Sequence, residues 1–205
     1  MSLFTGRLSA AVVEPELEPI TLAEARRQLN DPPTEDNDLI QECIAAAREM
    51  AEHRTHRQLV AATYIYSLDS FPGLDAPIML PKPPLQSVES ITYVDGAGDT
   101  QTLAASGYSV DTSGLLGVIV PAYDEIWPST RAQRGAVSIR FVTGWPVDDS
   151  VSPPVATTPS AIKRWMHCYI GAMYEHREAE IIGATTARFK FIDRLLDRWI
   201  VPEAP

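Results

Sequence analysis

The sequence predicts an α+β protein in which N- and C-terminal helices form a small helical bundle and an antiparallel β unit is inserted between them. Apolar residues recur every three or four positions near both ends of the chain, as they do on one face of a helix. Between these regions, short β-branched and aromatic runs alternate with turn residues. Because neither helical region can bury its apolar face alone, we expect the two to pack together.

Length and composition limit the possible classes of protein. A chain of 205 residues fits one domain, or a core domain with one insertion. No apolar run approaches the ~20 residues that a membrane span requires, and residues 1–10 do not follow the order of a secretory signal. Synthesis in the cytoplasm, with no membrane association, is therefore expected. Cys43 and Cys168 are interpreted as buried free thiols, because neither belongs to a metal-binding cluster.

The net charge of −10 is unevenly distributed along the chain. Residues 1–60 carry −5 and residues 61–158 carry −6, whereas residues 159–205 carry +1. Affinity for nucleic acid depends on clustered Lys and Arg that contact phosphates. A chain this acidic is not expected to bind nucleic acid, and its C-terminal region differs electrostatically from the rest.

The N-terminal half of the bundle is predicted within residues 19–60, after a flexible arm at residues 1–18. Thr21 and Glu24 have the spacing of a capping box, which begins a short helix that ends near Leu29. A longer helix is expected over residues 36–57. Its apolar stripe comprises Leu39, Ile40, Cys43, Ile44, Ala47, Met50 and Ala51.

The inserted β unit is assigned to residues 61–158. Strands are predicted at 63–68, 87–94, 108–110, 117–120 and 136–143. The Asp95-Gly96 pair between two of them is a hairpin signal. Trp127 and Trp145, each followed by proline, have two interpretations: they plug the ends of the β unit, or they are exposed anchors of a protein interface.

Residues 159–205 are predicted to complete the bundle. A helix begins near Pro159, and a second amphipathic helix is expected over residues 189–200 after a mobile link at 175–186. Trp165 and Tyr169 of the first helix are expected to contact the N-terminal half. The predicted helical core therefore consists of Leu39, Ile40, Cys43, Ile44, Trp165 and Tyr169.

Catalytic and metal-binding motifs are not found in the sequence. His53 and His56 have a spacing that can share a metal, but a third ligand is not evident, and cationic termination of a helix is the preferred interpretation. Neighbouring His167 and Cys168 do not face one another on a helix. The pairs Asp148-Asp149 and Asp124-Glu125 are interpreted as solvated loops. The chain is thus expected to have no catalytic residues, no metal and no cofactor.

An ordered series of segments resembles the phage head-tail connector family, whose members also occur in gene transfer agents. The resemblance covers roughly residues 19–180. It rests on Pro19 to Ala25, Asp38-Leu39-Ile40, Ile44 to Arg48, Phe71-Pro72-Gly73, Leu80 to Val88, Ile91 to Asp95, Val120 to Tyr123, Trp127-Pro128, Val137 to Gly144, Ile162-Lys163 and Tyr174 to Glu178.

This resemblance implies a non-enzymatic adaptor subunit in the neck of a virion or virion-like particle. Such subunits form a homo-oligomeric ring, usually of twelve copies, which docks on the portal protein and extends the DNA channel toward the tail. Tail-side stopper or terminator proteins would be further partners. Genomic DNA would pass through the ring without specific binding, for which an acidic wall is suited because it offers no anchor to phosphates.

The last predicted helix is the candidate portal-binding segment. The candidate residues are Arg188, Phe189, Lys190, Arg194, Leu195, Trp199 and Ile200, and the family resemblance implies that such C-terminal segments dock on the portal. The alternative is that this helix simply completes the bundle. Two other functions stay open: a peptide or small-molecule binding module built on the β unit, and a metal-dependent enzyme that uses His53 and His56.

Overall fold

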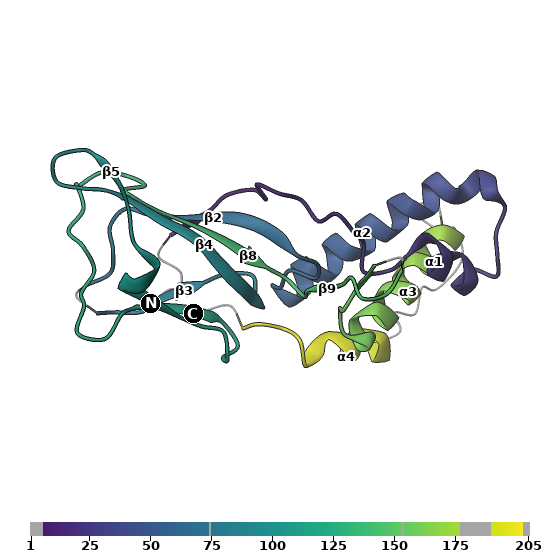
Figure 1. Cartoon of the computed structure of the whole chain (residues 1–205). Coiled ribbons are helices and arrows are strands. Elements are labelled where there is room, and N and C mark those ends of the chain that lie inside the picture. Colours follow the sequence, from purple (N-terminus) through teal and green to yellow (C-terminus); the bar gives the residue numbers. More distant parts are fainter. Residues whose placement is uncertain (1–5, 74, 153, 177–189, 203–205) are drawn as a thin grey trace. The chain divides into compact units, whose positions relative to one another are not determined.

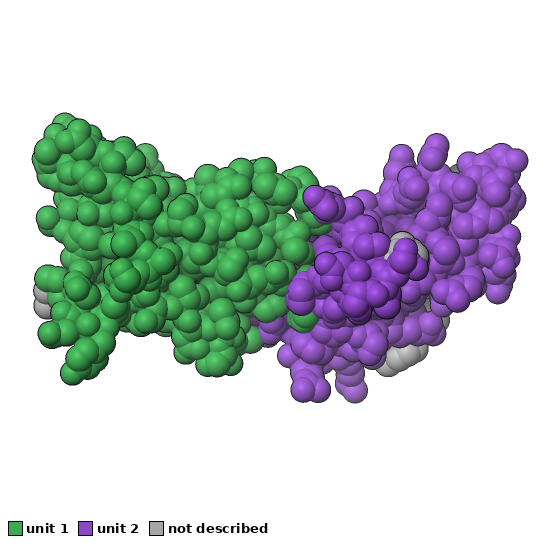
Figure 2. Space-filling view, viewed as in Figure 1, with its two compact units in different colours: residues 1–15, 61–145, 202–205 green, residues 16–60, 146–201 purple. Residues whose placement is uncertain are grey.

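A computed structural model describes residues 6–73, 75–152, 154–176 and 190–202 and has the predicted α+β fold. The chain forms two compact units (Figure 2). Unit 1 comprises residues 1–15, 61–145 and 202–205, and unit 2 comprises residues 16–60 and 146–201. The sequence-based division placed residues 146–158 in the β unit, whereas here they belong to the helical unit.

Unit 1 contains a five-stranded antiparallel sheet with the strand order β1-β2-β8-β4-β5 (Figure 1). Its strands are β1 (Arg7–Leu8), β2 (Ala62–Leu68), β4 (Leu85–Val94), β5 (Thr100–Thr102) and β8 (Val137–Thr143). Alternate residues of the central strand β8 are buried, which is the period-2 pattern of a strand with one face in the core. The Asp95 carboxylate accepts hydrogen bonds from the backbone N–H groups of residues 97, 98 and 99 at the predicted turn, and so closes a hairpin with β5, a strand that was not predicted.

A second sheet of unit 1 has the order β3-β7-β6. Its strands are β3 (Ile78–Leu80), β6 (Tyr108–Asp111) and β7 (Gly117–Pro121), and the short 3₁₀ helix η2 (Ala105–Gly107) precedes β6. Residues of both sheets share one hydrophobic core, to which Tyr66, Ile119 and Phe141 contribute. Trp127 closes this core: it is 6% exposed, its ring stacks on Phe71, and its Nε1 donates to the Ala76 carbonyl.

The N-terminal arm is ordered from residue 6 onward, in contrast to the flexible arm expected from the sequence. Arg7 and Leu8 pair with Ser67 and Tyr66 of β2, and the backbone N–H of Ser9 donates to the Ile65 carbonyl. The physical reason is the otherwise unpaired edge of β2, whose backbone groups the arm satisfies. This strand was not predicted because two residues are too few to show the alternating pattern of a strand.

Unit 2 contains the helices α1 (Leu22–Gln28), α2 (Asn37–Thr55), α3 (Ser160–Glu175) and α4 (Lys190–Asp197) (Figure 1). The 3₁₀ helix η1 (Thr34–Asp36) precedes α2, and the two-residue strands β9 (Val147–Asp148) and β10 (Val155–Ala156) pair before α3. Helices from both ends of the chain pack together, since α2 and α1 both contact α3, and α4 contacts α2 and α3. The predicted capping box is confirmed: the Glu24 N–H donates to the Thr21 hydroxyl, and the Thr21 N–H donates to the Glu24 carboxylate.

A partly buried polar network joins α2 to the segment before α1. Arg48, with 14% of its side chain exposed, pairs with Glu18 at 2.9 Å and with Glu52 at 3.3 Å. Glu52 also accepts hydrogen bonds from the Gln58 amide and the Leu59 N–H, at 2.8 and 3.0 Å. These bonds satisfy charges that would otherwise be buried unpaired. Among the described helices, none has both the length and the apolarity to cross a membrane.

Candidate docking surface at the C-terminal helix

Helix α4 packs in unit 2 through an apolar side. Leu196 is 1% exposed, and Val201 just after the helix is 5% exposed. Leu195 is half-buried, whereas Arg194 and Arg198 are exposed and Ile200 keeps 43% of its surface in solvent. Leu196 and Val201 thus pack within unit 2, whereas Arg194 and Asp197 of the helix, and Arg198 and Ile200 after it, face solvent.

Asp193 connects α4 to two other helices. Its carboxylate forms an ion pair with Arg54 near the end of α2 and accepts a hydrogen bond at 3.3 Å from Nε1 of Trp165 on α3. The guanidinium of Arg54 also lies 5.5 Å from the centroid of the Trp165 ring, within the range of a cation–π contact. A carboxylate, a guanidinium and an indole from three helices thus meet at one point.

The segment after α4 is held by one side-chain and one backbone hydrogen bond. Nε of Arg57 donates to the Trp199 carbonyl at 2.6 Å, and the Val201 N–H donates to the Thr55 carbonyl at 2.9 Å. Arg57 is 8% exposed, and burial lowers the pKa of its guanidinium. Two guanidinium groups lie near the Trp199 ring, that of Arg57 at 6.0 Å and that of Arg198 at 5.6 Å from its centroid.

The structure places the predicted portal-binding residues on different sides of this segment. Arg188 and Phe189 lie outside the described residues, and of Lys190 only its position at the start of α4 is described. Leu195 and Trp199 are half-buried in the bundle. Arg194 and Ile200 are exposed, and Arg198 joins them. We call these last three residues the C-terminal docking surface; whether it binds a partner stays a prediction.

Sequence reasoning missed Asp193, Arg54 and Arg57 as the residues that hold α4. Helix spacing gives no signal for Arg54 and Arg57, because α2 ends at Thr55 and Arg57 lies beyond it. No local pattern names a partner 139 or 142 residues away along the chain.

The predicted helical core is largely buried. Ile40, Cys43, Ile44 and Trp165 are at most 6% exposed, while Leu39 and Tyr169 are half-buried. Helices α2 and α3 pack against one another. The Trp165 ring stacks on Tyr169 one turn away, with centroids 4.9 Å apart. Direct contact between this aromatic pair and the apolar stripe of α2 stays a prediction.

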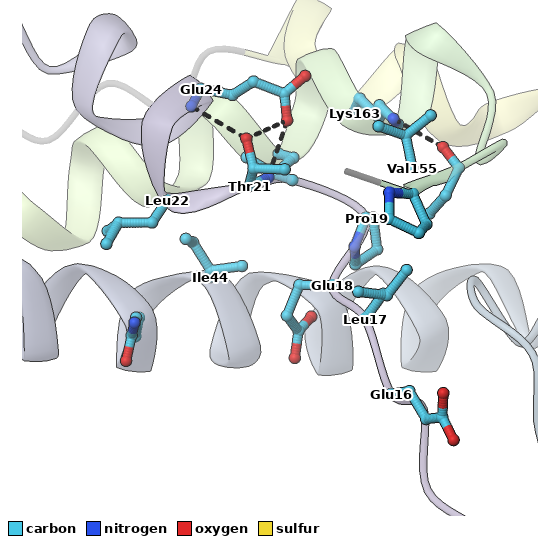
Figure 3. Close-up of a pocket in the computed structure, with 14 residues that line it drawn as sticks. Glu16, Leu17, Glu18, Pro19, Thr21, Leu22, Glu24, Ile44, Val155 and Lys163 are labelled. Atoms are coloured by element: carbon cyan, nitrogen blue, oxygen red, sulfur yellow. Dashed lines mark hydrogen bonds between the residues drawn. The ribbon is translucent and has the colours of Figure 1, made fainter. Parts of the chain in front are cut away.

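A groove with a volume of about 400 Å³ runs beside the start of α1 in unit 2 (Figure 3). Its walls include Leu17, Pro19 and Val155, and Ile44 reaches toward them from α2. Nζ of Lys163 donates to the Ala156 carbonyl at 2.9 Å. The groove is thus mostly apolar, with polar groups that largely bond to one another.

Glu24 is the ionisable group of this groove whose titration is shifted. Partial burial opposes its charged form, but hydrogen bonds from the N–H and hydroxyl of Thr21, together with the positive charge of Lys163, outweigh burial and lower its pKa. His167 behaves differently: burial lowers its pKa, against the attraction of Glu24. Its Nδ1 atom is buried without a hydrogen-bond partner.

The other candidate chemical groups are not brought together. The rings of His53 and His56 have centroids 6.4 Å apart, and the part of the chain that the structure describes holds no group of three metal-ligating side chains. Asp148 accepts hydrogen bonds from the N–H and hydroxyl of Ser150 in a turn, which lower the pKa of its carboxyl. Trp127 is buried in the β unit, which agrees with the interpretation that it plugs this unit and not with that of an exposed interface anchor.

The solved structures similar to this chain include three in which the alignment covers 97% of this chain and 97% of the other chain. One comes from the neck of an empty gene transfer agent particle computed with C6 symmetry, with a TM-score of 0.75 and 20% sequence identity. A second comes from the virion of a native gene transfer agent particle (TM-score 0.74, 21% identity). The third comes from the neck of a native particle computed with C12 symmetry (TM-score 0.69, 21% identity). No protein-family model and no curated protein sequence matches the chain. The likeness establishes a shared fold over nearly the whole chain.

Proposed function

We propose that this protein is a structural subunit of the neck of a virion or virion-like particle, where it forms an adaptor ring between the portal and the tail. The observation that carries this proposal is the fold shared over 97% of the chain with neck chains of gene transfer agent particles. The ordered series of family-like segments over residues 19–180 supports it independently. Twelve copies would match a portal with twelve-fold symmetry.

In this proposal the C-terminal docking surface contacts the portal protein. Arg194 and Arg198 are exposed on the only region of the chain with a positive net charge. Ile200, which is 43% exposed, adds an apolar anchor beside them. Arginine next to an apolar anchor is a combination that dominates many protein interfaces. Helix α4 does not project freely into solvent, because Leu196 and Asp193 hold it against the other helices of unit 2.

Passage of DNA without binding also fits the chain. Residues 61–158 carry a net charge of −6. Asp95 and the exposed Asp111 lie in turns, where hydrogen bonds from Gln101 and Ser113 lower the pKa of their carboxyl groups, so both keep their charge even in mild acid. Carboxylates of this kind repel phosphates and do not anchor them.

The proposal can be tested without removing the buried part of α4. In the variant Arg194→Glu/Arg198→Glu/Ile200→Ala, the buried residues Leu196 and Val201 are untouched. We expect this variant to fold with a wild-type unfolding midpoint, while particles made with it lose the subunit from the neck and do not acquire tails. Immunodetection of the subunit in purified particles and electron microscopy of the necks are the measurements.

A matched control keeps the number of substitutions but moves them to another exposed site of unit 2. Arg27→Glu/Arg164→Glu/Val151→Ala also changes two exposed arginines and one exposed apolar residue. We expect this control to support tail attachment. Deletion of residues 187–205 is the coarser test, because it also removes Leu196 and Asp193 and should destabilise the bundle. If the triple variant folds and joins heads to tails normally, portal docking through this surface is wrong.

A further inference from the structure

Residues 122–126 of unit 1, which we call the Tyr123 loop, present two large apolar side chains to solvent. Tyr123 is fully exposed, and Ile126 is 63% exposed. Single exposed apolar residues are common on protein surfaces, but an aromatic that contacts nothing, close to a second exposed apolar residue, is typical of a protein–protein contact.

The loop is held in place at both ends. The Ala122 N–H donates to the Gly107 carbonyl at 3.1 Å, and the Glu125 N–H donates to the Ala122 carbonyl at 3.0 Å. On the other side, the buried Trp127 ring stacks on Phe71 with centroids 4.9 Å apart and an interplanar angle of 3°. Because the loop is ordered before a partner arrives, association loses little conformational entropy at this site.

The surroundings of the loop are acidic. A shallow recess of about 520 Å³ is lined by Asp75, Asp124, Glu125 and Ile126 together with the adjoining backbone. The lining contains no basic residue, and none of the three carboxylates forms an ion pair with another described residue. The recess therefore favours a partner that offers cationic groups next to an apolar surface.

Unit 1 itself carries such cationic groups. Arg131 and Arg134 are both exposed, and neither forms an ion pair within the described part of the chain. The other basic residues of this unit are occupied: Arg7 by Asp69, Arg140 by Glu89 and Lys82 by the ring and hydroxyl of Tyr64. Within unit 1, Arg131 and Arg134 are thus the basic side chains that can complement the acidic loop of another copy.

The acidic and basic features belong to different sheets. The Tyr123 loop follows β7 of the three-stranded sheet. The Arg131 N–H donates to the Val94 carbonyl at the end of β4, and the Gly135 N–H donates to the Asp69 carboxylate just after β2, both in the five-stranded sheet region. A closed ring requires two different, complementary faces on each copy. An acidic and a basic site on the same unit provide the charge complementarity of such a contact.

We propose that the Tyr123 loop of one copy docks on the segment that carries Arg131 and Arg134 in the next copy of the chain. This inference rests on the proposed ring and specifies the contact that closes it. Tyr123 and Ile126 provide the apolar centre of the contact, and Asp75 and Glu125 face the arginines of the neighbour.

Paired cysteines test the contact in assembled particles. The chain Tyr123→Cys/Arg134→Cys is made in a Cys168→Ser background, while the buried Cys43 is kept. After oxidation of purified particles, a non-reducing gel should show a ladder of linked subunits, because each copy is joined on both sides. Each single cysteine variant, and the pair Tyr123→Cys/Val151→Cys, should give no ladder.

Charge reversal provides a second readout. Asp75→Arg/Glu125→Arg leaves Asp124 unchanged, because its φ of 63° suits Asp better than Arg. We expect this variant to keep the wild-type unfolding midpoint, since both residues are exposed, and to reduce the subunit content of particles about tenfold. Adding Arg131→Glu/Arg134→Glu to the same chain should restore it.

The outcomes separate this inference from the proposed function. If the subunit is present in particles at its normal level but no ladder forms, or if charge reversal has no effect on its level, the contact is wrong and the adaptor proposal stands. If the wild-type subunit is absent from particles, the adaptor proposal fails and this inference fails with it.

Discussion

Trp165 is the side chain through which three helices of unit 2 meet. It is 1% exposed, it stacks on Tyr169 of its own helix, and its indole contacts Arg54 of α2 and Asp193 of α4. Its apolar area and its N–H group are therefore both used. A residue with this position affects the stability of the bundle more than any of the exposed residues assigned to docking.

The first prediction is that Trp165→Ala lowers the free energy of unfolding by about 3–5 kcal/mol. The loss combines the transfer free energy of the indole with the cavity that it leaves and the lost hydrogen bond to Asp193. Urea unfolding followed by circular dichroism at 222 nm measures it. Tyr123→Ala is the control: its side chain is fully exposed, so its effect should stay within ~0.5 kcal/mol. Equal midpoints for the two variants would show that Trp165 does not organise the bundle.

The second prediction concerns Glu24, whose pKa is lowered in the folded protein although burial acts in the opposite direction. A carboxyl with a lowered folded pKa stabilises the fold above its unfolded pKa, and this contribution is lost as pH falls through the folded pKa. Titration of Glu24 by NMR should therefore give a midpoint below that of an ordinary glutamate. In Thr21→Ala, which removes the hydroxyl of the capping box, the midpoint should rise. An unchanged midpoint would mean that the capping box does not control this titration.

At the scale of elements, local signals in the sequence identified the helices and the longer strands, but not the strands of two or three residues, β1, β3, β5, β9 and β10. The Thr21–Glu24 capping box, the Asp95-Gly96 hairpin and the stripe from Leu39 to Ala51 all correspond to observed elements. Two kinds of feature were not predictable. Strand β1 is too short to show a period, and the Asp193 contacts join residues far apart in sequence. Periodicity reports local geometry and burial, but not which distant partner a side chain meets.

The third prediction tests strand β1. A Cβ atom at Gly6 would lie 2.5 Å from the Tyr66 ring and 2.7 Å from the Ser67 carbonyl oxygen. Gly6→Ala should therefore loosen the arm from β2 and speed amide exchange at Ser9 and Val12, which donate to β2 carbonyls. Gly96→Ala, where a Cβ would meet nothing within 4 Å, is the control. Exchange that is equally slow in both variants would show that the arm tolerates the added methyl group.

At the scale of the whole molecule, each copy carries a net charge of −10. Copies brought together in a ring therefore repel one another, and this repulsion must be offset by specific contacts. A contact of the size of the Tyr123 loop is small compared with the ~800 Å² per partner of a stable interface. Binding of many copies to one template raises their effective concentration and so favours contacts that are weak between free copies.

The last prediction follows from this balance between net repulsion and a small contact. The isolated chain should be a monomer of 22.5 kDa by size-exclusion chromatography with light scattering. Mixed with its portal, it should co-migrate as a ring with a fixed number of copies, because the template supplies the local concentration that free copies lack. The Arg194→Glu/Arg198→Glu/Ile200→Ala variant should remain monomeric in the same mixture, whereas Asp75→Arg/Glu125→Arg should bind the portal substoichiometrically. These different results follow because the first variant removes the contact with the template and the second removes the contact between neighbours. A wild-type chain that never co-migrates with the portal at any ionic strength would contradict the adaptor function itself.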